Sequence, residues 1–311
     1  GHGTWTLSQN SSTALSGFET STKMLCTSNG GTPSGADFVI MFYNIEGHDT
    51  QRLKFGQSDA ERFTVSWYVR SNKTGTGVLE AQTTESTASA TVETSKTYTI
   101  SQANTWEFKS VTFPANTDHA QATANKTTST GLSLRWVLDS GTNLTSGTAQ
   151  TTWANQTTAN RWVGQNLGIG RADDDYMEMT GLQIDVGDVA QAFKYESFEQ
   201  NLARCQRYFQ DTNRTYSSGY QSGTTAVYGT FANLVPMRAN PTMTNSSSTI
   251  SVSQAGGAHS NRTTTGLTAN IFGNSGAGIE VIYTCGGGIG GSDNYPCQIF
   301  TIGTLSFDAE L

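Results

Sequence analysis

Charged residues are scarce in this chain, and basic residues are scarcer than acidic ones. Only 14% of its 311 residues are charged, and 25 acidic residues against 18 basic ones leave a net charge of −7. Nucleic acids and anionic membrane surfaces are bound through a basic face, so the composition argues against both as partners. The chain is nevertheless not disordered by composition, because its 14 Phe, 11 Tyr and 6 Trp residues can fill real cores.

Long apolar runs are absent, and prolines are rare. No stretch approaches the roughly 18–20 apolar residues that a membrane-spanning helix needs, so we expect no insertion into a membrane. With five prolines, the loops are shaped mainly by Gly and Asn, which suit tight turns. Thr and the aromatic residues suit pleated strands. The composition therefore favours strands over helices.

Cysteines are few and lack a metal-binding spacing. The four are Cys26, Cys205, Cys285 and Cys297, and they form no paired C-x-x-C motif, so we expect no structural zinc site. Cys285 and Cys297 bracket a glycine-rich loop between two strand-like runs, which makes a disulfide between them one interpretation. The alternative is two free thiols, with Cys205 packed as a small hydrophobe.

Alternating apolar residues are the main structural signal of the first two thirds of the chain. Segments 62–71 and 131–141 place bulky residues on one parity only, which is typical of strands with one buried face. Segment 36–45 is apolar on both parities, which predicts a strand that is covered on both faces. Many short strands of this kind, separated by Gly, Asn and Thr turns, predict an antiparallel jelly-roll β-sandwich over residues 1–193.

One helix is expected, in the segment "YESFEQNLARCQRYFQDT" at 195–212. Ser197 and Gln200 have the spacing of a capping box. Apolar residues follow at the helical spacing i, i+4, i+7 and i+11: Phe198, Leu202, Cys205 and Phe209. A helix of about three turns is marginal alone, so we expect this stripe to be buried at an interface between domains or between subunits.

Strand-like segments resume after this helix. The sequence therefore predicts an all-β protein in three parts. Residues 1–193 are expected to form a jelly roll, residues 194–212 a helical connector, and residues 213–311 a smaller C-terminal β-sandwich domain.

Catalytic constellations are hard to find in this sequence. None of the histidines lies in a nucleophile or metalloprotease motif. A glycosidase needs two carboxylates across a cleft, and Asp175, Glu178 and Asp185 are candidates that no motif resolves into a pair. Asp185 alternates with the inward-facing Ile184 and Val186, so it is expected to face solvent or a groove. We therefore expect no enzymatic activity and no organic cofactor.

The triplet Asp173, Asp174 and Asp175 is a candidate calcium site. Three neighbouring carboxylates repel one another unless a cation or an arginine compensates, and Ca²⁺ accepts such oxygen ligands. The alternative is a solvated acidic turn beside Arg171. A structural Ca²⁺ ion is thus the one cofactor that the sequence suggests.

Aromatic residues in polar stretches are candidate sugar-binding platforms. Sites for sugars combine exposed rings with amide, hydroxyl and carboxylate groups. Trp153 and Trp162 stand in a polar stretch without strand alternation, Tyr216 and Tyr220 lie in a second such stretch, and Tyr295 follows the glycine-rich loop. The alternative for the two tryptophans is that they cover one end of the sandwich.

Several segments, in order along the chain, resemble a family of phage proteins. These are 44–77, 98–117, the run "TGLQIDVGDVAQAFKYESFEQNLARCQRYF" at 180–209, the segment "VPMRANPTMT" at 235–244 and the terminal "FDAEL" at 307–311. Together they resemble tail-fibre-like and other structural proteins of phage virions. The resemblance implies a jelly roll like those of carbohydrate-binding modules, followed by a short helix and a small β domain, in a protein that is commonly trimeric. It implies no catalytic residues and no particular ligand contacts.

The resemblance and the composition lead to one functional expectation with two alternatives. The chain is expected to be a tail-fibre or head-fibre protein that attaches to a host surface polysaccharide without turnover. It would act as a homotrimer among other virion proteins and would be extracellular after release. The alternatives are a purely structural or capsid-decorating virion component, and a secreted carbohydrate-binding protein or accessory module of a glycan hydrolase.

Overall fold

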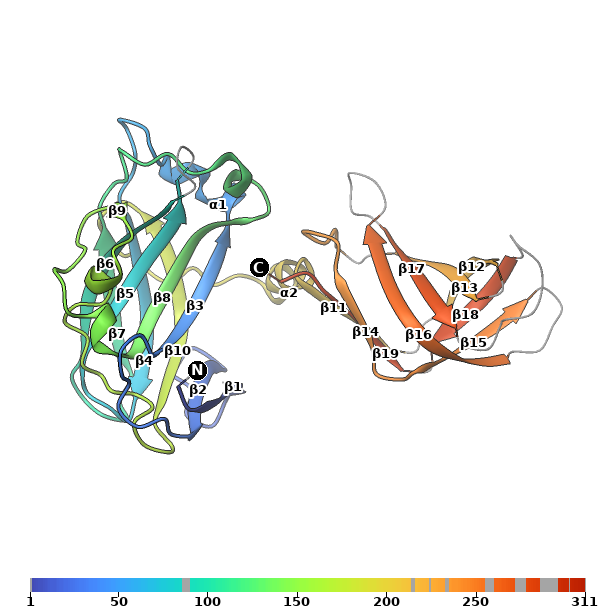
Figure 1. Cartoon of the computed structure of the whole chain (residues 1–311), viewed down its shortest axis with the longest axis horizontal. Helices are drawn as coiled ribbons and strands as arrows, with labels where there is room; N and C mark the ends of the chain where they lie inside the picture. The colour runs from blue at the N-terminus through green and yellow to red at the C-terminus, as the bar shows by residue number, and fades with distance from the viewer. Residues whose placement is uncertain are drawn as a thin grey trace. The chain divides into compact units, whose positions relative to one another are not determined.

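The structure is a computed structural model. It describes residues 2–85, 90–213, 216–223, 225–232, 235–254, 260–271, 278–285, 296–301 and 303–310. Strands dominate both parts of the chain, and contacts divide it into two compact units, Gly1–Lys194 and Tyr195–Glu310 (Figure 1). The predicted all-β fold class is confirmed.

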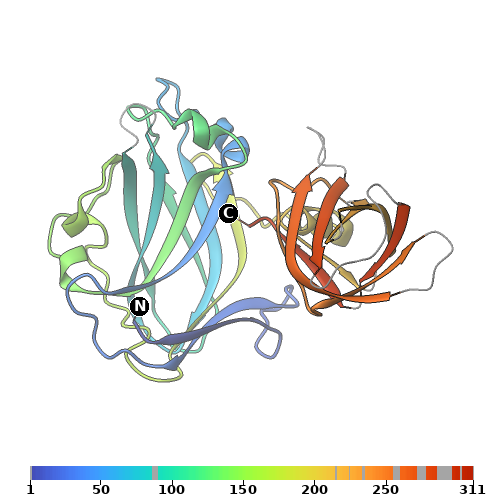
Figure 2. The same cartoon turned by 45° about the vertical axis from the view of Figure 1, so that its right-hand side comes forward.

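The first unit is a sandwich of two five-stranded antiparallel sheets (Figures 1 and 2). One sheet has the strand order β1-β2-β10-β4-β7 and the other has the order β3-β8-β5-β6-β9. Without the outermost strands β1 and β9, these orders are those of a jelly roll wound from two Greek keys, so the predicted architecture is confirmed. The bounds are β1 Thr4–Asn10, β2 Ser21–Ser28, β3 Phe38–Glu46, β4 Phe63–Ser71, β5 Gly75–Thr84, β6 Thr91–Ile100, β7 Glu107–Phe113, β8 Thr130–Ser140, β9 Ala154–Asn155 and β10 Tyr176–Val186.

Large aromatic residues fill the space between these two sheets. Trp67 of β4 and Trp136 of β8 meet edge to face, with ring centroids 5.8 Å apart, and Tyr98 of β6 lies 5.1 Å from Trp67. All three are buried, and each buried aromatic side chain contributes about 2 kcal/mol or more through removal of apolar surface from water. The period-two alternation of segments 62–71 and 131–141 thus becomes the packed interior.

Strand β3 departs from the predicted burial. Val39 and Met41 pack on the core of the sandwich, but Phe38 and Phe42 on the opposite face are 44% and 58% exposed. The prediction that segment 36–45 is covered on both faces is therefore wrong. Strand β3 is an edge strand of its sheet, and its outer face remains exposed at Phe42.

The burial of Asp185 and Val186 at the end of β10 is also the reverse of the prediction, although Val186 pairs with the buried Phe63 and so lies on the predicted side of the sheet. Val186 is exposed and Asp185 is buried. Asp185 accepts hydrogen bonds from the backbone N–H of Gln191, at 3.0 Å, and from the side chain of Gln183, at 2.9 Å. The segment that leaves the sandwich folds back over this face, and it stays attached as far as Lys194, whose N–H donates to Gln183.

The second unit begins with helix α2, Phe198–Gln206. Its capping box is formed as predicted, with the hydroxyl of Ser197 accepting from the N–H of Gln200 and the side chain of Gln200 accepting from the N–H of Ser197. The helix belongs to the second unit rather than standing apart as a connector. In the part of the chain that the structure describes, no helix has the length and apolar character to cross a membrane.

Six strands of the second unit close into an antiparallel barrel, β12-β13-β17-β16-β15-β18, beside a three-stranded sheet, β11-β19-β14. The sequence pattern suggested a smaller sandwich, and the alternation is the same in both cases because a barrel is a sheet closed on itself. Closure removes the exposed sheet edges. The bounds are β11 Phe209–Asn213, β12 Tyr216–Ser222, β13 Ala226–Ala232, β14 Thr242–Asn245, β15 Thr249–Gln254, β16 Ser260–Ile271, β17 Gly278–Cys285, β18 Pro296–Thr301 and β19 Thr304–Asp308.

Candidate functional site

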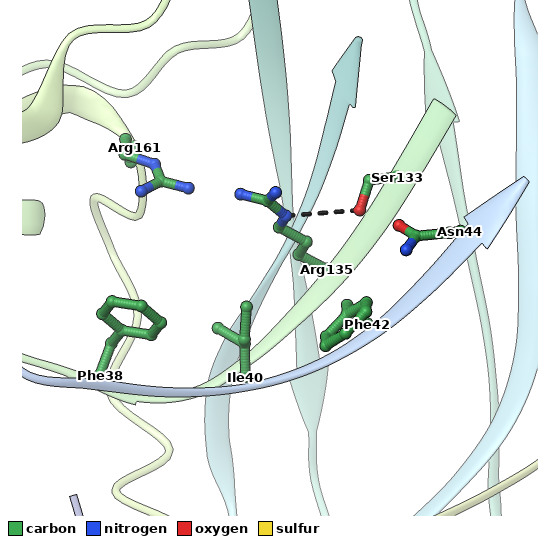
Figure 3. Close-up of a pocket in the computed structure, with 7 residues that line it drawn as sticks. All are labelled: Phe38, Ile40, Phe42, Asn44, Ser133, Arg135 and Arg161. Atoms are coloured by element: carbon green, nitrogen blue, oxygen red, sulfur yellow. Dashed lines mark hydrogen bonds between the residues drawn. The ribbon is translucent and has the colours of Figure 1, made fainter. Parts of the chain in front are cut away.

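A groove of about 240 Å³ lies on the outer face of the sheet that contains β3 and β8. Figure 3 shows three apolar side chains in a row along β3, with polar side chains of β8 and of a loop beside them. The lining residues are Phe38, Ile40, Phe42, Asn44, Ser133, Arg135 and Arg161. The groove thus combines exposed rings with amide, hydroxyl and guanidinium groups on one rigid sheet, which is the composition of a ligand site.

Strand register accounts for the position of the polar groups next to the aromatic ones. Phe42 of β3 pairs with Arg135 of β8, which pairs with Glu80 of β5. These three residues therefore form one row across the outer face, because directly paired residues point to the same side of a sheet. Asn44 pairs in the same way with Ser133 in the next row.

Arg161 reaches this face from the loop that crosses it. Its Nε and Nη2 atoms donate to the two carboxylate oxygens of Glu80, both at 3.0 Å. The next residue, Trp162, is fully buried against Val78 and Val137 of the sheet, and its indole N–H also donates to Glu80, at 3.0 Å. The loop is therefore anchored by Trp162, and the position of Arg161 is held from two sides.

Behind the groove, two carboxyl groups lie in contact. Burial together with the charge of Glu80 raises the pKa of Glu93 to about 8. As an ionised group, the Oε1 atom of Glu93 would be buried without a partner among the described residues. A proton on Glu93 removes this deficit, because a carboxylate can only accept while a carboxylic acid also donates.

The two predicted tryptophan platforms are not available for stacking. Trp162 is fully buried as described, and Trp153 is buried in the main core. There it packs 5.3 Å from Phe55 and donates its indole N–H to the carbonyl of Pro114 at 2.8 Å. The alternative interpretation, in which both tryptophans cover the sandwich, is the one that the structure supports. The polar sequence neighbours of both tryptophans leave the choice between these two interpretations open from sequence alone.

The tyrosine candidates have three different outcomes. Tyr220 is half-exposed and stacks on Tyr228, with ring centroids 4.9 Å apart and planes 6° apart. Its outer ring face thus remains a candidate for stacking. Tyr216 lies in β12, but its side chain is outside the described residues, as is Tyr295.

The aspartate triplet does not form a metal site. Asp175 is buried and accepts from the backbone N–H groups of Gly170 and Ala172, at 3.1 and 3.0 Å. Asp173 accepts from the backbone and side chain of Asn29, both at 2.7 Å. Within the described ranges, no group of three or more His, Cys, Asp or Glu residues could hold a metal ion. The carboxylates instead brace the loop before β10.

Cysteines are free thiols throughout the structure, including the pair suggested as a disulfide. Cys285 and Cys297 are buried in the core of the second unit, where burial raises the pKa of each thiol. Cys205 is exposed on α2, so its predicted packing as a small hydrophobe is not observed.

The apolar stripe of α2 is not buried by its own unit. Phe198 is 77% exposed, and Leu202, Cys205 and Phe209 are exposed as well. Phe198, Leu202 and Cys205 have the helical positions that were predicted, but α2 ends at Gln206 and Phe209 begins β11. The expectation that an interface between domains or between subunits buries the stripe stays a prediction. An exposed apolar patch of this kind is typical of interaction surfaces.

The carboxylates suggested for a glycosidase are also dispersed among structural roles. Glu178 is buried and accepts from Asn10 and Thr13, and it pairs with Arg70 at 2.7 Å. Burial raises the pKa of Glu178, but these hydrogen bonds outweigh burial, and the net pKa is lowered. Asp175 and Asp185 are each held by backbone N–H groups as described, so the three do not face one another as an acid and a nucleophile.

The groove residues were not among the candidates from sequence. The pattern of segment 36–45 does place Phe38, Ile40 and Phe42 on one face, and this was the available signal. It was read as a buried face because every residue on it is apolar. No sequence pattern indicated that Arg135 and Arg161 lie together, because a strand residue and a loop residue are brought together only by the fold.

A scan against protein-family models finds none that matches this chain, and a search of curated proteins finds no match either. The groove, its charges and the exposed stripe of α2 are therefore the observations from which function is inferred.

Proposed function

We propose that this chain is a fibre or adhesin protein of a phage virion, and that its jelly roll attaches to a host surface glycan through the groove on β3 and β8. The observation that supports this most strongly is the row of exposed Phe38 and Phe42 beside Asn44 and Arg135. Sugars present apolar C–H faces edged by hydroxyls, so they suit rings that are flanked by hydrogen-bonding groups.

The expected strength of one such contact is modest. Covering the exposed half of a phenylalanine ring removes about 100 Å² from water, which is worth roughly 2 kcal/mol. Two rings then supply about 4 kcal/mol, the free energy of a millimolar complex, before the losses of association. Attachment to a polysaccharide would therefore gain from several copies of the groove acting together.

A homotrimer would supply those copies, and the exposed stripe of α2 is the surface that we assign to it. Phe198 and Leu202 would be covered by equivalent helices of other copies, as short amphipathic helices need a partner. Light scattering is expected to give a molar mass near three chains. Phe198→Asp should lower it, while Glu199→Gln, on the neighbouring exposed position, should not. A wild-type mass near one chain would contradict the trimer.

We propose binding without turnover. Glu80 is held by two bonds from Arg161, and Glu93 is in contact with it. A glycosidase holds its two carboxyl groups about 5–9.5 Å apart on either side of the bond that it cleaves. Both carboxyl groups are buried, so they cannot flank a sugar in this way. Release of reducing ends from the bound polysaccharide would contradict this part of the proposal.

Binding of host surface polysaccharide in affinity electrophoresis tests the role of the groove. Phe42→Ala is expected to weaken the retardation about tenfold. Phe108→Ala is the matched control, because Phe108 is 50% exposed on β7 of the other sheet. Equal loss in both variants, or no binding by the wild type, would favour the purely structural or capsid-decorating alternative.

The remaining alternative, a secreted carbohydrate-binding or hydrolase-accessory protein, would use the same groove. Labelling of intact virions by an antibody against this chain separates the two. The virion fibre requires labelled particles, and unlabelled particles would leave the secreted protein as the better explanation.

A further inference from the structure

The ionisable residues that line the groove are both arginines, Arg135 and Arg161. Figure 3 shows their guanidinium groups next to each other above the row of β3 side chains. Both are partly exposed, at 26% and 12% of their side chains. The wall of the groove therefore carries positive charge and no carboxylate, although the protein as a whole has a net charge of −7.

The negative charge behind these arginines is smaller than the number of carboxyl groups suggests. Glu80 is committed to Arg161 through two hydrogen bonds of 3.0 Å. Glu93 is buried, accepts from Gln156 at 2.8 Å and lies 3.4 Å from Nε of Arg161. Its pKa is raised to about 8 by burial and by the neighbouring Glu80, which leaves a surplus of positive charge at the groove below that pH.

Of the two arginines, Arg135 has the weaker contacts with a carboxylate. Its contacts are long, at 3.4 Å from Nε to Ser133 and 3.5 Å from Nη1 to Glu80. Among the described residues, its Nη2 atom has no hydrogen-bond partner. A guanidinium has five N–H donors in a planar fork that matches an oxyanion, so Arg135 has donors left for a ligand.

Screening makes this local charge more important than the net charge. At physiological ionic strength the Debye length is about 8 Å, so the acidic residues elsewhere on the protein contribute little inside the groove. A ligand that touches Phe42 lies within reach of Arg135, because the two residues are directly paired across β3 and β8.

We propose that the groove is selective for anionic saccharides, with a carboxylate or sulfate group bound by Arg135, assisted by Arg161, and an adjacent sugar ring stacked on Phe42. This inference rests on the proposed glycan binding at the groove and specifies the class of glycan. Phe42 supplies affinity for the ring, and Arg135 supplies the discrimination between charged and neutral sugars.

Matched pairs of polysaccharides test this directly in affinity electrophoresis. Polygalacturonate is compared with its fully methyl-esterified form, and dextran sulfate with dextran, so that the members of each pair share a sugar backbone and differ in their anionic groups. At least one anionic member is expected to bind about tenfold or more tightly than its neutral partner. The pair that shows the difference identifies carboxylate or sulfate as the source of the charge.

Two variants locate the effect. Arg135→Met is expected to reduce binding of the anionic member about tenfold and to leave the weak binding of the neutral member unchanged. Arg62→Met removes an exposed arginine elsewhere in the jelly roll and should change neither. If Arg135→Met does not fold, Arg135→Lys keeps the charge but not the planar fork, and an intermediate loss is expected.

The outcomes separate the two proposals. Equal binding of charged and neutral partners, lost in Phe42→Ala, would overturn anion selectivity and leave glycan binding at the groove intact. Selective binding that Arg135→Met and Arg135→Lys leave unaffected would also overturn the inference, because the charge would be recognised elsewhere. Loss of all binding in Phe42→Ala together with selectivity lost in Arg135→Met supports both.

Discussion

Glu178 and Glu93 are buried carboxyl groups on the outer faces of the two sheets of the same jelly roll, and they have opposite charge states. Glu178 accepts bonds from Asn10, Thr13 and Arg70, and these hold its pKa below the ordinary value despite burial. For Glu93, burial and the neighbouring Glu80 prevail, and its pKa is raised to about 8. The number of donors, and not burial alone, decides which carboxyl group keeps its charge.

This difference separates a structural clamp from a binding surface. The carboxylate of Glu178 ties the start of the chain to β10 and β4 through Asn10, Thr13 and Arg70. The uncharged Glu93 instead does not neutralise the neighbouring arginines, so their positive charge can attract an anionic ligand. We therefore expect substitutions at Glu178 to alter stability and substitutions in the groove to alter binding.

The largest expected effect is the loss of the clamp. Glu178→Gln leaves Arg70 without its buried partner, which should lower the free energy of unfolding by about 3 kcal/mol. Chemical denaturation monitored by tryptophan fluorescence measures it. Asp59→Asn is the control, since Asp59 pairs with Lys54 on the surface and such exposed pairs contribute little to stability. Similar losses in both would show that Glu178 is not a special site.

Next in size is the effect of Phe42→Ala on binding. Removing an exposed ring should weaken polysaccharide binding by roughly 1–2 kcal/mol while the free energy of unfolding changes by about 0.5 kcal/mol or less. Glu178→Gln should show the reverse pattern, with reduced stability and unchanged binding at temperatures where it is folded. A folded Glu178→Gln protein that had lost binding would contradict the assignment of stability to the face with Glu178 and of binding to the face with the groove.

The effect expected from Glu93→Gln grows with pH. Because the folded pKa lies above the unfolded value of about 4.3, the stability of the wild type falls as pH rises from about 4 to about 8. Glutamine keeps the side chain uncharged, so the variant should become more stable relative to the wild type as the pH rises through this window. Thermal unfolding at pH 4.5 and pH 8 measures the difference. For Glu178 the sign is opposite, and its contribution is lost as the pH falls through its lowered pKa.

The smallest effect is on the pH dependence of anion binding. The charged and polar groups that face Glu93 are Glu80 of β5, Arg135 of β8, and Arg161 and Gln156 of the covering loop. Ionisation of Glu93 above about pH 8 cancels the surplus positive charge, so binding of an anionic polysaccharide should weaken a few-fold. Glu93→Gln should flatten this profile, and a neutral polysaccharide should show no such dependence. A wild-type profile that is flat from pH 6 to pH 9 would count against the neutral Glu93.

Local sequence patterns predicted the strands and the helix of this fold, but they did not predict correctly which faces of the strands are buried. The alternation around Trp67 and Trp136 predicted two strands with buried aromatic faces, and Ser197 with Gln200 predicted the start of α2. The same patterns left the burial of Trp162 undecided and placed the outer face of β3 in the interior. In both cases the answer depended on the path of a loop, because the loop that buries Trp162 leaves Phe42 exposed.

The sequence by itself determined an all-β chain with a jelly roll, one capped helix and a second β unit. It could do so because side-chain alternation and helix capping are set by neighbours along the chain. Only the tertiary structure decided that Phe42, Arg135 and Glu80 form one row under Arg161, because cross-strand register and loop path join residues that are distant in sequence. The charge of Glu93 followed from that arrangement, since it depends on which groups the fold brings within hydrogen-bonding distance.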